Sequence, residues 1–137
     1  MSTVEIAWTK KLQFVGTDST QHAIVLSSAN EENRTGVKPS DLLLMALGGC
    51  TAVDVVEILR KKRQQLTGLT IHVSGEQDAD PPWTFRRMHL VYEVRGRGLA
   101  AGAVEQAVAL SEDKYCSVRA TLADKVEITR EVRIVEE

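Results

Sequence analysis

The feature that most constrains this chain is a long helical segment whose first half is apolar on every side. Pro39 and Ser40 suit a helix start, because proline fits the first turn and serine can cap it. The predicted helix runs from near Ser40 to near Gln65 and begins with the apolar run Leu42 to Leu47. Such a helix must be surrounded by protein. A chain of 137 residues covers it most easily with a second copy of itself, so the sequence predicts a homodimer.

Short segments of alternating polarity lie on both sides of this helix. They cover residues 4 to 14, 22 to 27, 69 to 73, 88 to 94 and 126 to 134, and they predict strands. Residues 99 to 114 have the pattern of a second helix. The predicted order is therefore β-β-α-β-β-α-β. Paired strands between helices favour hairpins, which indicates one α+β domain over residues 1–137 with antiparallel sheets.

Composition argues against several kinds of partner. The formal net charge is -2 and aromatic residues make up 4% of the chain, so no surface for nucleic acid is indicated. The segment Met1 to Glu5 has no basic stretch followed by an apolar run, which argues against a signal peptide. The run Leu42 to Leu47 is far too short to span a bilayer. We therefore expect a cytoplasmic protein with neither a nucleic-acid nor a membrane partner.

The chain has two cysteines, Cys50 and Cys116. Permanent disulfides are rare in the cytosol, so these are either inert core thiols or working ones. Cys50 follows Gly48 and Gly49 inside the predicted helix, where each glycine costs about 1 kcal/mol relative to alanine. The two glycines indicate a close helix crossing, access to the sulfur, or both. Cys116 ends the second predicted helix and has the features of either a buried structural thiol or a working one.

A metal site is not expected from the pattern of cysteine and histidine. The chain has no Cys-x-x-Cys pair, and His22, His72 and His89 are scattered along predicted strands. Zinc sites need such ligands at close spacing. We expect neither a metal nor a bound cofactor.

Two segments resemble those of a known family. Residues 39 to 51, PSDLLLMALGGCT, resemble the stretch around the first cysteine of the OsmC/Ohr family, the osmotically inducible protein C and organic hydroperoxide resistance proteins. Residues 114 to 118, KYCSV, look like the segment with the second cysteine. Element order and cysteine spacing are similar too. The resemblance implies an OsmC-like fold, an intertwined homodimer with a site at the subunit interface, and reduction of organic hydroperoxides in oxidative-stress defence.

The chemistry that the resemblance implies uses both sulfurs. A Cys50 thiolate attacks the O–O bond, releases an alcohol and becomes a sulfenic acid. Cys116 then condenses with it to a disulfide, which a small dithiol or a lipoylated protein reduces by exchange. The rival interpretation is a non-catalytic dimeric module that binds an apolar ligand, or a redox sensor, with the cysteines in its core.

The attacking sulfur needs a positive group or a strong donor, because apolar surroundings disfavour a thiolate. The family supplies an arginine from its N-terminal strands and a glutamate ten residues before the cysteine. Here Ser40 takes the place of that glutamate, and the first 21 residues contain no arginine. Asp41 and Arg34 are the remaining candidates for this role, and we predict that both lie near Cys50.

Overall fold

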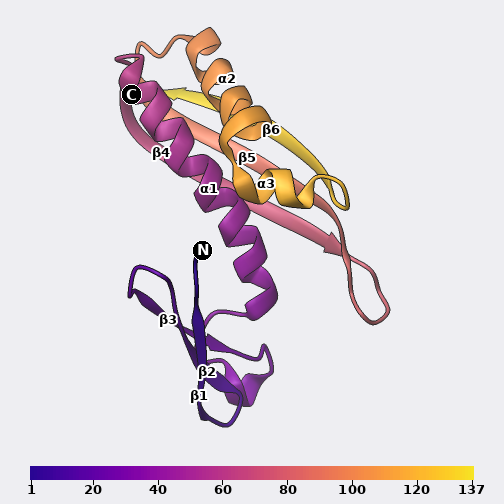
Figure 1. The fold of residues 1–137 in the computed structure, drawn as a ribbon. Helices are drawn as coiled ribbons and strands as arrows, with labels where there is room; N and C mark the ends of the chain where they lie inside the picture. Colours follow the sequence, from indigo (N-terminus) through magenta and orange to yellow (C-terminus); the bar gives the residue numbers. More distant parts are fainter. The chain divides into compact units, whose positions relative to one another are not determined.

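The computed structural model describes residues 1–137, the side chain of Glu31 excepted. It contains two compact units, residues 1–43 and 44–137 (Figure 1). The elements are β1 (Glu5–Lys10), β2 (Gln13–Thr17), β3 (Ala23–Ser27), a 3-10 turn η1 (Glu31–Asn33), α1 (Pro39–Lys61), β4 (Gln65–Gln77), β5 (Phe85–Arg97), α2 (Ala101–Leu110), a π-helical turn η2 (Ser111–Tyr115), α3 (Ser117–Leu122) and β6 (Glu127–Glu136). The α+β class is confirmed, while the single domain over residues 1–137 stays a prediction.

The first unit contains an antiparallel sheet of order β1-β2-β3. The prediction of one strand over residues 4 to 14 is wrong, because the chain reverses at Lys11, whose φ is 46°. Trp8 and Phe14 are partners across the resulting hairpin. Because paired residues lie on the same face of the sheet, the alternation of apolar and polar residues continues from β1 into β2. This continuity made the two strands look like one in the sequence.

The second unit contains a sheet of order β4-β5-β6. Strands β4 and β5 form the expected antiparallel hairpin, but β6 pairs with β5 in parallel. The expectation of antiparallel sheets therefore fails at this edge. The reason is the connection between the two strands. The helical segments α2, η2 and α3 follow β5 and return the chain to the edge of the sheet where β5 begins, so that β6 runs in the same direction as β5. The helix α3 was not predicted at all.

The core of the second unit lies between its helices and one face of its sheet (Figure 1). Its fully buried side chains come from α1, β5 and α2, and include Leu47, Val55, Leu59, Leu90, Tyr92, Val94, Val104 and Val108. Only one side of α1 is buried in this way. Met45 and Val53, on the same helix, are 54% and 67% exposed. The chain therefore leaves part of its most apolar helix uncovered.

Candidate active site

The two cysteines interact within the second unit. Cys116 is 2% exposed, whereas Cys50 on α1 is half-buried, and both are free thiols. Burial raises the pKa of the Cys116 thiol to about 11, and the neighbouring Cys50 thiol contributes to the same shift. Cys116 is therefore a protonated thiol at neutral pH. In the described part of the chain, neither cysteine belongs to a cluster of three or more side chains that could hold a metal.

The two glycines before Cys50 have different surroundings. A Cβ added at Gly48 would lie 2.9 Å from Cγ2 of Val73 on β4, so this glycine allows α1 to approach the sheet closely. A Cβ added at Gly49 would meet no described heavy atom within 4 Å. The close contact at Gly48 is therefore between helix and sheet, not the predicted crossing of two helices, while Gly49 lies on the same side of α1 as the exposed Met45 and Val53.

A π-helical turn places Cys116. Its backbone N–H donates to the Ser111 carbonyl over 2.7 Å, which closes the turn η2. Its Sγ accepts a hydrogen bond of 3.3 Å from the backbone N–H of Arg119. The sequence predicted an ordinary helix to residue 114, because a π turn has no distinct apolar pattern. Such turns are often found at functional sites.

A buried carboxylate lies in the same turn. The Glu112 side chain is only 2% exposed, and its Oε2 accepts a hydrogen bond of 2.9 Å from the Tyr92 hydroxyl. Its Oε1 accepts one of 3.1 Å from Nε of Arg119, and Nη1 of Arg130 lies 3.6 Å from Oε2. A buried charge needs such partners, because removing it from water is costly. This cluster of three partners around Glu112 brings together β5, β6, η2 and α3.

Sequence reasoning missed this cluster. One signal was available: Val104, Val108 and Glu112 follow each other at intervals of four, so an acidic residue continues the apolar face of the second helix. A carboxylate at such a position predicts a buried partner. Its partners come from distant parts of the chain and could not be identified from spacing.

A hydrogen bond also connects the π turn to α1 near Cys50. Within α1, the Thr51 hydroxyl donates to the Gly48 carbonyl over 3.1 Å. The Ser111 hydroxyl donates to Oδ2 of Asp54, one helical turn beyond Cys50, over 2.8 Å. Burial raises the pKa of the Tyr92 phenol above its ordinary value, so its hydroxyl remains a donor.

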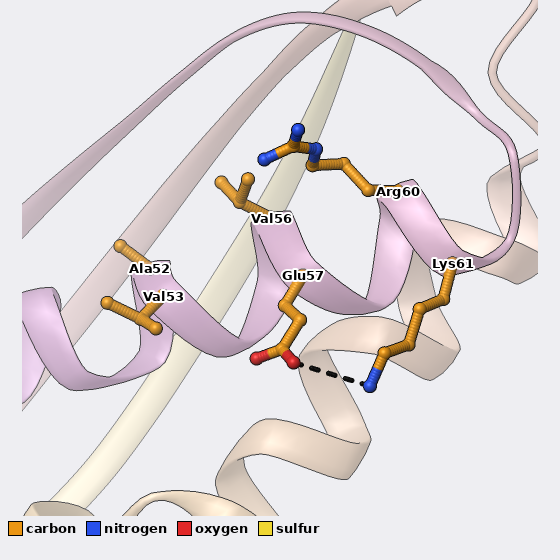
Figure 2. A pocket seen from close by; sticks show the side chains of 6 residues that line it. All are labelled: Ala52, Val53, Val56, Glu57, Arg60 and Lys61. Atoms are coloured by element: carbon orange, nitrogen blue, oxygen red, sulfur yellow. Dashed lines mark ion pairs between the residues drawn. The ribbon is translucent and has the colours of Figure 1, made fainter.

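Two hollows flank the exposed part of α1. One, of about 590 Å³, is lined by Asp54, Glu57, Ile58, Lys61, Lys62, Leu110 and Tyr115. Asp54 follows Cys50 by one helical turn and Tyr115 directly precedes Cys116, but neither cysteine lines this hollow. The other, of about 710 Å³, is an open strip along α1 with Ala52, Val53 and Val56 at one end and the Glu57–Lys61 ion pair at the other (Figure 2).

The predicted activators lie in the first unit. Arg34 is exposed, and its Nε donates to the carbonyl of Ala29 over 3.1 Å. Asp41 is half-buried in the first turn of α1, where its N–H donates to the Lys38 carbonyl over 3.0 Å. No ion pair joins Arg34 to Asp41 among the side chains that the structure describes. Their placement near Cys50 stays a prediction.

Comparison with known proteins places this arrangement in a family. The family model described as OsmC-like protein matches residues 30–131. Protein YhfA of Escherichia coli (strain K12) is 35% identical over 130 residues, which cover 95% of this chain and 96% of YhfA. The chain therefore belongs to the OsmC/Ohr family, which confirms the resemblance.

Solved structures agree on the fold. An OsmC-like protein from Mycoplasma pneumoniae superposes with a TM-score of 0.85 at 16% identity, covering 98% of this chain and 97% of the other. The organic hydroperoxide resistance protein OhrB of Bacillus subtilis superposes with a TM-score of 0.65 at 13% identity, covering 97% and 98%. At these identities the likeness shows the fold alone.

Proposed function

We propose that this chain is a thiol-dependent peroxidase that reduces organic hydroperoxides, with Cys50 as the attacking sulfur and Cys116 as the resolving one. The observation that carries the proposal is the interaction of a half-exposed Cys50 with a buried, protonated Cys116. Membership of a family that includes organic hydroperoxide resistance proteins supports the same chemistry.

The reaction balances with these two sulfurs and one peroxide. The Cys50 thiolate attacks the outer oxygen of the peroxide, the O–O bond breaks, and the alkoxide takes up a proton to leave as an alcohol. Cys116 then displaces hydroxide from the Cys50 sulfenic acid, an S–S bond replaces the S–O bond, and the thiol proton leaves in the water formed. An external dithiol or a lipoylated protein returns two electrons by thiol–disulfide exchange.

Exposure and charge support the proposed order of the two sulfurs. At pH 7 a thiol whose pKa is about 11 is ionised in about one molecule in ten thousand, so Cys116 is a poor first nucleophile. Cys50 is the more exposed of the two. A peroxide therefore meets Cys50 first.

A homodimer is part of the proposal. The exposed apolar side chains Met45 and Val53 lie on α1, and the open strip in Figure 2 continues this surface. A second copy would cover it, and light scattering at micromolar concentration should give twice the chain mass. The predicted domain of residues 1–137 and the activating roles of Asp41 and Arg34 belong to the same proposal.

The proposed location is the cytoplasm, because working thiols need a reducing compartment. Among the described residues, α1 is the one helix long and apolar enough to cross a membrane, judged by length and composition alone. The core helix of a soluble protein meets the same criterion, and α1 carries the buried residues Leu47, Val55 and Leu59 on its inner side.

A rival function is supported by one observation in the first unit. A hollow of about 290 Å³ there is lined mostly by apolar side chains, from Val4, Ile6, Gly16, Thr17, Asp18, His22, Ile24, Leu26 and Leu42. A non-catalytic module that binds an apolar ligand would use such a hollow, and the cysteines would then be core residues or a redox sensor.

Reaction rates distinguish the two functions. The reduced protein should consume cumene hydroperoxide faster than free cysteine does, and faster than it consumes hydrogen peroxide, because apolar residues flank Cys50. Cys50→Ser should lose this reaction. A wild-type rate no higher than that of free cysteine would favour the ligand-binding module.

A further inference from the structure

Arg119 holds the π turn at both of its ends. Its backbone N–H donates to the Cys116 sulfur over 3.3 Å. Its side chain reaches back to the other end of the turn, where Nε donates to the Glu112 carboxylate over 3.1 Å and Nη1 to the Glu112 carbonyl over 3.5 Å. A shift of Glu112 would therefore be transmitted to the hydrogen bond on the resolving sulfur.

Glu112 in turn attaches the π turn to the sheet. The Tyr92 hydroxyl on β5 and the Arg130 guanidinium on β6 both contact its Oε2, at 2.9 Å and 3.6 Å. Tyr92 is fully buried, and the two arginine side chains are 25% and 31% exposed. The only strongly buried charge of the cluster is thus the carboxylate on the segment that ends at Cys116.

The charge of Glu112 connects several elements at once. Apolar residues of similar volume often replace a buried ion pair without loss of stability, and in some proteins a charged cluster is kept because it fixes one arrangement of its elements. The arrangement fixed by Glu112 sets the position of Cys116 relative to α1, which carries Cys50. This position matters in one step only, the formation of the S–S bond.

We propose that Glu112 is a positioning residue for the resolving step: through Arg119, Tyr92 and Arg130 it holds Cys116 where it can reach the Cys50 sulfenic acid. This inference rests on the proposed peroxidase function for its role in turnover. In that step the Cys116 sulfur bonds to the Cys50 sulfur, the S–O bond breaks, and hydroxide leaves with the thiol proton as water. A misplaced Cys116 leaves the sulfenic acid exposed to a second peroxide, which converts it to the sulfinic acid.

The test compares Glu112→Gln with a matched control, Glu105→Gln, which removes an exposed carboxylate 4.0 Å from the same Arg130. Each reduced protein is mixed with cumene hydroperoxide, quenched at intervals and analysed by intact mass. In Glu112→Gln the Cys50 thiol should react at the wild-type rate, but disulfide closure should slow on the order of tenfold and sulfinic acid should appear. Glu105→Gln should match the wild type.

A second arm of the experiment needs no peroxide. In glutathione redox buffers, the equilibrium constant of the Cys50–Cys116 disulfide reports how well the two sulfurs are held together. It should fall on the order of tenfold in Glu112→Gln. Tyr92→Phe removes one hydrogen bond to Glu112 and keeps both of its ion pairs, so it should lower the equilibrium constant by a smaller factor. If Glu112→Gln does not fold, Tyr92→Phe provides the test instead.

The outcomes separate the two proposals. Wild-type equilibrium constants in every folded variant of Glu112 and Tyr92 would overturn the positioning role. The wild type could fail to react with peroxide while the equilibrium constant of its disulfide is still higher than that of Glu112→Gln or Tyr92→Phe and equal to that of Glu105→Gln. In that case the peroxidase function is wrong and the positioning role is supported. Equal changes of the equilibrium constant in Glu105→Gln and Glu112→Gln would also contradict the positioning role, because they would indicate a general effect of removing a negative charge.

Discussion

The two cysteines have opposite surroundings. Cys50 lies half-exposed on a regular α-helix. Cys116 is 2% exposed, ends a π turn and accepts a hydrogen bond from Arg119. A solute therefore reaches the first sulfur and not the second. This difference is what a two-cysteine peroxidase requires, because the resolving thiol must meet the oxidised partner and not the peroxide.

The largest effect that we expect from this difference is on alkylation. In Cys50→Ser at pH 8, iodoacetamide should label Cys116 on the order of a hundredfold more slowly than free cysteine, since burial, the largest cause of the raised pKa of Cys116, remains in the variant and disfavours the thiolate. Labelling should recover in urea. Native labelling as fast as that of free cysteine would show that Cys116 is not enclosed.

Stability at high pH gives a second test. The pKa of Cys116 is raised in the folded state from 9.0 to about 11, so between these values the folded chain keeps a proton that the unfolded chain has lost. Stability from this group is complete below pH 9 and is lost as the pH rises towards 11, by up to about 2 kcal/mol. Urea unfolding of the reduced wild type and of Cys116→Ser should show this loss in the wild type alone. Parallel pH profiles would contradict the assignment.

The two glycines give the smallest expected effect and compare the two sides of α1. Gly48→Ala should lower the free energy of unfolding by about 1 kcal/mol, because the new methyl group crowds Val73. Within a single chain a methyl group at Gly49 meets nothing, so Gly49→Ala should raise the free energy of unfolding of the monomer by up to about 1 kcal/mol, the ordinary gain of alanine over glycine in a helix. Urea unfolding measures both. The same sign for the two substitutions would mean that the sides of α1 do not differ as described.

The sequence predicted the parts of the molecule that depend on local pattern. The start of α1 at Pro39, the hairpin of β4 and β5, and the α+β class follow from capping and alternation. The parallel pairing of β6 depends on a connection whose path is set by packing, and it was missed. The turn at Lys11 was hidden because Trp8 and Phe14 continue one pattern across it.

The candidate site was predictable only in its sulfurs. Cys50 and Cys116 stand out by residue type and by their neighbours in sequence. Glu112 is marked only by its place on the apolar face of the second predicted helix, and its partners Tyr92, Arg119 and Arg130 are ordinary residues until the fold brings them together. These partners come from three different elements, so their identity could not be predicted from spacing.

The most direct test of the central claim is intact mass after one equivalent of cumene hydroperoxide. The wild type should lose about two hydrogens, because sulfenic acid formation is followed by condensation to a disulfide. Cys116→Ser should stop at a sulfenic acid, one oxygen heavier, and over-oxidise with excess peroxide. Cys50→Ser should remain unchanged on the same timescale. If Cys50→Ser instead reacts as fast as Cys116→Ser, the two sulfurs are equivalent and the division of roles between them is wrong.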